Sequence, residues 1–145
     1  MDELRKQMRI ALATVFGFYV KAHNFHWNVE GPNFYEYHKL FDDIVDDVYG
    51  SIDPLAEHIR TLQAYVPGSF KRFADLSKVE DTLEVPTAKE MISILHADNE
   101  IVITTLNQAF NAAQTQKAQG LMNFLADRID QHQKWGWFLR VSTKP

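Results

Sequence analysis

Cysteine is absent from the 145 residues of the chain. This excludes disulfides, zinc-thiolate sites, iron–sulfur clusters and cysteine nucleophiles, and it is typical of a reducing compartment such as the cytoplasm. An apolar run of the roughly 20 residues needed to cross a bilayer is also missing. The N-terminus "MDELRKQMRIALATVFGFYV" has acidic residues first, and its apolar residues continue at helical spacing into "KAHNFHW". We therefore interpret it as a helix of the mature protein rather than as a signal peptide.

A long cluster of Lys or Arg is missing as well, and the formal net charge is −4. Electrostatics therefore gives no reason to expect a nucleic-acid partner. With 46% hydrophobic and 23% charged residues, the chain can bury a core. Its length suits one domain, which we expect to span residues 1–145.

Apolar residues recur at steps of three and four in four long segments, and no strand-like alternation or internal repeat occurs. The expected helices cover residues 2–28, 34–62, 88–113 and 121–141. "EGP" at 30–32 ends the first helix, and Asn33 with Glu36 predicts a capping box for the second. "TAKE" at 87–90 predicts another capping box for the third. Pro54 lies inside the second helix and should kink or divide it near Asp53.

The connection of residues 63–86 is long, and "SFKRFADLS" within it can form a short helix. Short turns join the first helix to the second and the third to the fourth, so each pair is antiparallel. The long connection must then travel the length of the bundle before the third helix begins. We predict an all-α four-helix bundle with ferritin-like connectivity and a short helix in the long connection.

The second helix carries a polar stripe that can bind metal. Steps of 4, 7, 4 and 4 residues keep its members on one broad face: His38, Asp42, Tyr49, Asp53 and Glu57. His26, at the end of the first helix, can lie beside His38 across the short turn. Imidazole and carboxylate without thiolate suit iron, manganese or zinc rather than copper(I).

The two ligand pairs of this stripe cannot share an ion within one chain. Asp42 and Asp53 are 11 residues apart, which is about 16 Å along a helix, whereas metal–ligand bonds are about 2 Å. Either one pair is unused, or there are two separate sites, or a second subunit brings its own Asp53 and Glu57. An isologous two-fold contact between antiparallel second helices would achieve the last arrangement and give two equivalent sites per dimer.

Two other interpretations of this stripe compete with a metal site. A His or Asp pair on a helix is most often a solvated face, and the stripe of a purely structural bundle would only set the register of an oligomer. Bundles that hold two irons inside one subunit use Glu-x-x-His on two helices. The chain contains no Glu-x-x-His, which disfavours an intrasubunit site of that kind.

"HWNVEGPNFYEYHKLFDD" followed by "DPLAEHIR" resembles the Dps family, the DNA-protection-during-starvation proteins or mini-ferritins. The residues that carry the resemblance are His26, Trp27, Gly31, Phe34, His38 and Asp42, then Asp53 and Glu57. The C-terminal "LADRIDQHQKWGWFLR" resembles the last helix of the family. The likeness covers nearly the whole chain.

This resemblance implies a hollow homo-oligomeric shell, a dodecamer of tetrahedral symmetry. It implies iron sites at the two-fold interfaces, with His26, His38 and Asp42 from one subunit and Asp53 and Glu57 from its partner. It also implies a ferroxidase that oxidises Fe(II), preferably with hydrogen peroxide, stores ferric mineral and limits oxidative damage. By this resemblance Trp27 packs near the iron site, as a radical scavenger or as interface core.

Departures from the family pattern are informative. The Lys-rich N-terminal tail of DNA-binding members is missing, and twelve chains at −4 each would carry about −48, which repels phosphate. Both facts argue against direct DNA binding, the main rival function. The acidic residue that lines the iron-uptake pore in many members is replaced by Asn123. His58 stands where an Arg is usual, and Pro54 lies between the ligands Asp53 and Glu57 and can tilt them.

Overall fold

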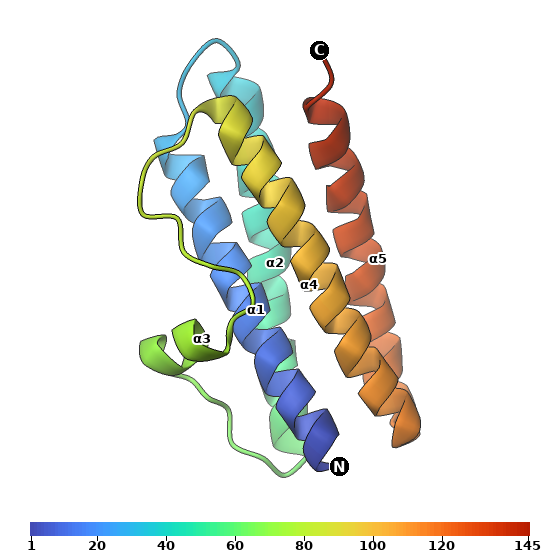
Figure 1. Ribbon diagram of the computed structural model, residues 1–145. Coiled ribbons are helices and arrows are strands. Elements are labelled where there is room, and N and C mark those ends of the chain that lie inside the picture. The colour runs from blue at the N-terminus through green and yellow to red at the C-terminus, as the bar shows by residue number, and fades with distance from the viewer.

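Five α-helices and no strands make up the computed structural model, which describes residues 1–145 (Figure 1). Their bounds are α1 Asp2–Asn28, α2 Phe34–Thr61, α3 Phe70–Leu76, α4 Ala88–Thr115 and α5 Gln119–Ser142. The expected bundle is confirmed, and the short helix in the long connection is α3. The turn between α4 and α5 is shorter than predicted, because both helices extend into the polar segment 114–120.

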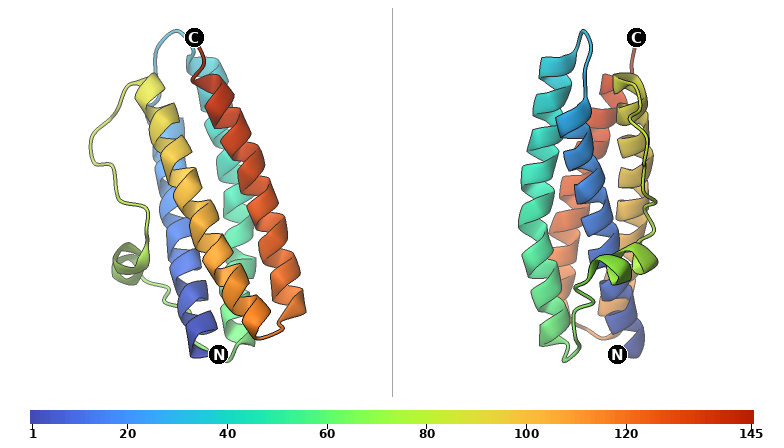
Figure 2. Two further views of the ribbon diagram at one scale, coloured as in Figure 1. Left: turned by 45° about the vertical axis from the view of Figure 1, so that its right-hand side comes forward. Right: turned by 90° about the vertical axis from the view of Figure 1, so that its left-hand side faces the viewer.

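The long connection gives the bundle its ferritin-like path. Helices α1 and α2 form one antiparallel hairpin and α4 and α5 form the other (Figure 2). From the end of α2 the chain returns outside the bundle, packs α3 against α1, and begins α4 at the opposite end. As a result α2 and α4 run in the same direction, and α1 packs against α2, α3 and α4.

The hydrophobic core follows the predicted apolar stripes. Phe18 and Phe25 of α1 and Phe41 of α2 are its largest fully buried side chains. Complete burial of such a side chain contributes about 1.5–3 kcal/mol relative to leaving it in water. Phe34, at the start of α2, lies outside this core, because its side chain is 42% exposed and stacks on His38.

One of the two predicted capping boxes forms. The Thr87 hydroxyl accepts a hydrogen bond from the backbone N–H of Glu90, whose carboxylate accepts from the backbone N–H of Thr87. The box predicted at Asn33 was wrong, since the Asn33 side chain makes no capping hydrogen bond. Its ψ of 26° is far from the extended backbone that capping residues usually adopt. The turn itself supplies an acceptor instead, because Phe34 N–H donates to the Gly31 carbonyl at 3.0 Å.

The sequence predicted that Pro54 would kink or divide the second helix, and of these two outcomes division does not occur. Helix α2 is continuous from Phe34 to Thr61, with Pro54 inside it. The missing N–H deprives the carbonyl of Gly50, four residues earlier, of its helical donor. Gly50 is exposed and has no neighbour within 4 Å of the place where a Cβ would stand. Water can therefore reach the freed carbonyl, and no side chain at position 50 crowds the proline ring.

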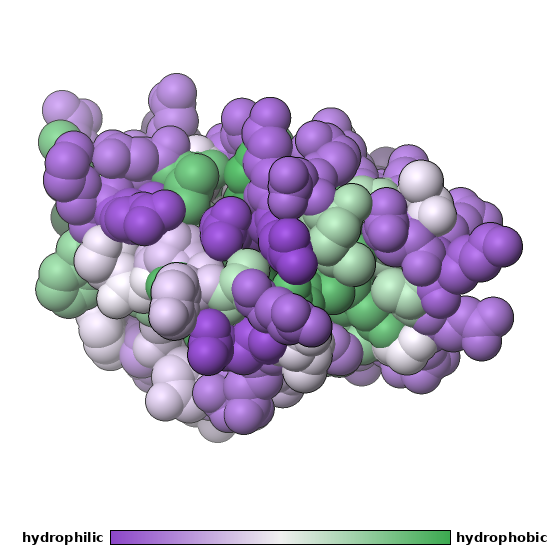
Figure 3. All heavy atoms as spheres, turned by 90° about the horizontal axis from the view of Figure 1, so that it is seen from below, coloured by the Kyte–Doolittle hydropathy of each residue, from purple (hydrophilic) through white to green (hydrophobic).

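The end of the bundle near the N-terminus is mostly covered by hydrophilic residues, with hydrophobic ones visible between them (Figure 3). Among the helices, none combines the length and the apolar character that a membrane span requires.

Candidate metal centre

His26 and His38 lie face to face where α1 and α2 meet. Their ring centroids are 3.9 Å apart and their planes differ by 15°. Nδ1 of His26 lies 2.8 Å from the carbonyl oxygen of His38, and Nδ1 of His38 lies 2.7 Å from the carbonyl oxygen of His26. The five-residue turn between the helices thus places two imidazoles in a reciprocal clamp. The expectation that His26 lies beside His38 is confirmed.

This clamp determines which nitrogen of each ring can bind a metal. A carbonyl oxygen can only accept, so each Nδ1 must carry a proton and donate. In the neutral imidazole the lone pair is then on Nε2. Backbone carbonyls that hold the second nitrogen in this way are the usual support of metal-binding histidines. In both rings Nε2 is therefore the nitrogen whose lone pair is free.

Asp42 supplies the first anionic group beside these nitrogens. Its Oδ1 is 3.8 Å from Nε2 of His26, and its side chain is 42% exposed. The neighbouring Asp43 points elsewhere, since its carboxylate accepts from the Lys39 ammonium at 2.6 Å. Of these two consecutive carboxylates, Asp43 is thus engaged in a surface ion pair and Asp42 is not.

Asp53 and Glu57 lie on later turns of α2 and are both exposed. The structure of a single chain brings His26, His38 and Asp42 together but leaves these two carboxylates apart from them. Within one chain, no group of three or more His, Asp or Glu side chains is arranged to hold a metal ion. His26, His38 and Asp42 therefore do not by themselves form such a group.

Aromatic side chains surround the histidine clamp. Trp27 is 65% exposed and stacks on His23, with 4.1 Å between ring centroids. Nδ1 of His23 lies 3.3 Å from the hydroxyl of Tyr19, and the rings of Tyr19 and Tyr49 are 5.5 Å apart. His23 thus makes aromatic and hydrogen-bonding contacts rather than facing only solvent.

Sequence reasoning missed a polar network inside the bundle. Arg128 of α5 binds Asp47 of α2 through two N–H···O hydrogen bonds of 2.9 Å, and the Trp135 indole donates to the same carboxylate at 2.8 Å. Burial raises the pKa of Asp47, but the hydrogen bonds from Arg128 and Trp135 outweigh it and leave the pKa lowered. Asp47 was not singled out from the sequence. Its position between the buried residues Ile44 and Ser51 on the helix is the signal that could have identified it.

His132 extends this network into the core and is completely buried. Its Nδ1 donates to the side-chain oxygen of Asn99 at 2.8 Å, while the Asn99 amide donates to the His132 carbonyl at 2.8 Å. Arg128 donates to its Nε2 at 3.4 Å. Burial, reinforced by the positive charge of Arg128, lowers the pKa of His132 to about 3. Both ring nitrogens are occupied, so His132 is a neutral structural residue rather than a metal ligand.

A second buried ion pair joins α1 to α4. The Lys21 ammonium lies 2.7 Å from Oδ2 of Asp98, and both side chains are almost fully buried. That oxygen makes no aligned hydrogen bond, so the contact is chiefly a charge pair. Removing either partner would leave an unpaired buried charge. The pair therefore helps to fix how α1 packs on α4.

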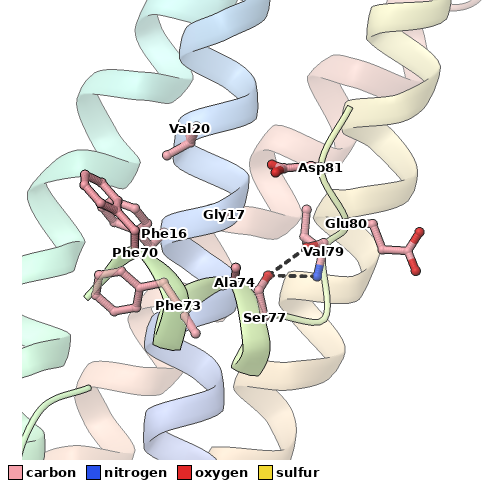
Figure 4. Close-up of a pocket in the computed structure, with 11 residues that line it drawn as sticks. Phe16, Gly17, Val20, Phe70, Phe73, Ala74, Ser77, Val79, Glu80 and Asp81 are labelled. Atoms are coloured by element: carbon pink, nitrogen blue, oxygen red, sulfur yellow. Dashed lines mark hydrogen bonds between the residues drawn. The ribbon is translucent and has the colours of Figure 1, made fainter. Parts of the chain in front are cut away.

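A cavity of about 630 Å³ lies between α1 and the long connection (Figure 4). Phe16 and Val20 of α1 and Phe70 and Phe73 of α3 give it an apolar lining. Glu80 and Asp81 lie at its edge, and it contains no histidine. Gly17 allows the connection to approach α1 closely, since a Cβ there would stand 2.8 Å from the Ser77 hydroxyl oxygen. The chemistry of this cavity does not match that of the histidine clamp.

Comparison with known proteins places these features in a family. The family model described as a ferritin-like domain matches residues 5–142. An uncharacterised low temperature-induced protein of Nostoc sp. is 31% identical over 131 residues, which are 89% of this chain and 73% of that protein. DNA protection during starvation protein 2 of Bacillus anthracis is 26% identical over 85% of this chain and 84% of its own.

Solved structures agree with the sequence relatives. A Dps protein from Vibrio cholerae O1 superimposes with a TM-score of 0.93 at 25% identity, and the match covers 99% of this chain and 90% of that one. That protein is described as a member of a broad superfamily of ferritin-like diiron-carboxylate proteins.

Proposed function

Because the chain belongs to the Dps branch of the ferritin-like family, we propose that it oxidises Fe(II), with hydrogen peroxide as the preferred oxidant, and stores the ferric product. The family as a whole supports a general role in iron storage and protection against oxidative stress. The observation that carries the more specific proposal is the reciprocal His26–His38 clamp. It leaves the Nε2 lone pair of each ring free, and Nε2 of His26 lies 3.8 Å from Oδ1 of Asp42.

The proposed site is shared between two subunits. His26, His38 and Asp42 of one protomer would bind Fe(II) together with Asp53 and Glu57 of the partner subunit. The exposed positions of Asp53 and Glu57 on the same helix as His38 support this arrangement. Two antiparallel copies of α2 around a two-fold axis would place each half-site opposite its complement.

Each ligand has a distinct role in the proposed reaction. Asp42 of one protomer and Glu57 of the partner subunit supply negative charge. This charge stabilises Fe(III) more than Fe(II) and so favours oxidation. His26 and His38 are neutral ligands whose orientation is fixed before the metal arrives. Asp53 of the partner subunit either bridges or hydrogen-bonds a ligand. Fe(II) is the substrate, and the ferric product leaves the site for the mineral.

We further propose that the protein assembles as a dodecameric shell in the cytoplasm. The exposed aromatic residues Trp27 and Tyr49 flank the half-site, where a two-fold partner would cover them. The net charge of −4 per chain supports a shell that acts on iron rather than one that binds DNA directly. Acidic residues facing the interior would give the mineral its first attachment points.

Two neighbouring aspartates provide a matched test. The paired substitutions His38→Ala and Asp42→Ala should slow peroxide-driven Fe(II) oxidation by at least about tenfold, since removing even an outer-shell partner of a metal ligand has an effect of that size. Asp43→Ala removes a carboxylate from the same turn but only breaks the pair with Lys39, so its rate should match wild type. Stopped-flow absorbance of the ferric product measures both. Equal rates in the two variants would contradict the ferroxidase assignment.

A further inference from the structure

A series of aromatic rings leads along α1 to the histidine clamp. The ring centroids of Tyr19 and His23 are 5.5 Å apart, and those of His23 and His26 are 5.9 Å apart. Tyr49 of α2 continues the series from the other side of Tyr19, at 5.5 Å. Two oxidisable phenols thus lie within a short distance of a group assigned as an iron ligand. Neither phenol belongs to the ligand set.

Tyr19 differs from the other tyrosines in having a base as its partner. In the tautomer of His23 that carries its proton on Nε2, the Tyr19 hydroxyl donates to Nδ1 of His23 across 3.3 Å. A phenol gives up an electron most easily when its proton leaves at the same time, so a neighbouring base favours its oxidation. Tyr35 and Tyr65 are 76% and 81% exposed, and neither has a histidine contact.

The proposed reaction of a single Fe(II) with hydrogen peroxide requires a second electron, which a tyrosine–histidine pair can supply. Reduction of one hydrogen peroxide to two waters takes two electrons and two protons, whereas one Fe(II) supplies one electron. When a site holds a single Fe(II), one-electron reduction breaks the O–O bond and releases hydroxide and a hydroxyl radical. A second electron from the protein would prevent that release.

We propose that Tyr19 supplies this second electron and that His23 takes the phenolic proton. This inference rests on the ferroxidase function proposed above. Fe(II) becomes Fe(III), the O–H bond of Tyr19 breaks to give a neutral tyrosyl radical, and His23 becomes protonated. Hydrogen peroxide gains both electrons, its O–O bond breaks, and two hydroxide ions form. Their negative charges balance the charge gained by iron and by His23, so the step needs no further reactant.

A covalent link between Tyr19 and Tyr49 is a second measurable product of the proposed reaction. Tyr49 can pass an electron to the Tyr19 radical, with its phenolic proton released to water, while Tyr19 regains its proton from His23. This moves the oxidised site to the exposed ring of Tyr49, which is 63% accessible in the single chain. A second oxidation in the same pair then places two radicals 5.5 Å apart between ring centroids. They can combine through a carbon–carbon bond, after which the hydrogen on each joined ring carbon moves to the phenol oxygen and no atom leaves. The product is a dityrosine link between α1 and α2 of one chain.

Freeze-quench electron paramagnetic resonance tests the proposal directly. The assembled protein receives one Fe(II) per site without oxygen and is then mixed with one equivalent of hydrogen peroxide. Wild type should show a tyrosyl radical, and Tyr19→Phe should lose it and release more hydroxyl radical to a spin trap. Tyr35→Phe is the matched control and should resemble wild type in both measurements.

His23→Gln should weaken the radical signal because the phenolic proton of Tyr19 has no acceptor. Tyr49→Phe should keep the early signal but lose the peptide that joins residues 19 and 49 in mass spectrometry.

The possible outcomes distinguish a failure of the Tyr19 proposal from a failure of the proposed ferroxidase function. If peroxide oxidises Fe(II) no faster in wild type than in the His38→Ala and Asp42→Ala double variant, both proposals fail. If oxidation is fast but the radical is absent, lies on Trp27, or persists in Tyr19→Phe, only the role of Tyr19 is overturned.

Discussion

At the scale of single residues, His132 makes the fold sensitive to acid. Its folded pKa of about 3 lies below the ordinary value of 6.5. Between these two values the unfolded chain binds more protons than the folded one, so the free energy of unfolding falls as the pH falls. The loss is at most about 1.4 kcal/mol per pH unit from this one group. Asp47, whose pKa is also lowered, loses its contribution at still lower pH, as the pH falls through its folded pKa.

Replacing His132 by Gln should remove this dependence. Between pH 6.5 and pH 4, wild type should lose roughly 3 kcal/mol of stability from His132, and the His132→Gln variant should not. The variant should be less stable at pH 7, since it disturbs the hydrogen bonds with Asn99 and Arg128. Urea unfolding at one fixed protomer concentration measures the difference, because assembly also contributes to stability. Parallel pH curves below 6.5 would show that His132 does not titrate as described.

The contact between His26 and His38 could be predicted from the sequence only in part. The short turn after His26 and the helix start before His38 indicated that the two side chains would be neighbours. Their reciprocal bonds to each other's carbonyl could not be predicted, because they depend on the crossing of α1 and α2 to within a fraction of an ångström. Asp47 was missed for a related reason. Its partners Arg128 and Trp135 are 81 and 88 residues away in sequence.

At the scale of the helix, capping depends on the backbone conformation of the residue and not on its type alone. Thr87 has a ψ of 161°, so its hydroxyl reaches the N–H of Glu90, whereas Asn33 has a ψ of 26° and its amide caps nothing. The sequence contains both motifs and cannot distinguish them.

This difference predicts unequal effects of the same substitution. Thr87→Ala should lower the free energy of unfolding by about 1 kcal/mol, because it leaves an N–H at the start of α4 without its acceptor. Asn33→Ala should change it by less than about 0.5 kcal/mol, as is usual for an exposed side chain without such a bond. Urea titrations of both variants beside wild type measure the two values. Equal losses would mean that Asn33 does cap α2 in solution.

At the scale of the whole molecule, the path of the chain decides which of the proposed ligands one subunit can bring together. Four long helices and one long connection were enough to predict the ferritin-like path, because helical periodicity and turn length decide both. The length of α2 keeps the five proposed ligands from meeting within one chain, since His38 and Glu57 lie 19 residues apart on one continuous helix. Pro54 leaves that helix undivided, so it does not bring the two halves together.

A complementation experiment tests the sharing between subunits. One variant carries His38→Ala and Asp42→Ala, and the other carries Asp53→Ala and Glu57→Ala. Each should be inactive alone, provided that light scattering shows the same assembled mass as wild type. In a mixed two-fold dimer, one site receives both damaged halves and the other receives both intact halves. Random co-assembly in equal amounts should therefore restore about a quarter of the wild-type sites, because half of the dimers are mixed and each has one intact site of two. Sites formed within single chains would stay inactive in every mixture, so an absence of recovered Fe(II) oxidation in correctly assembled mixed shells would exclude the shared centre.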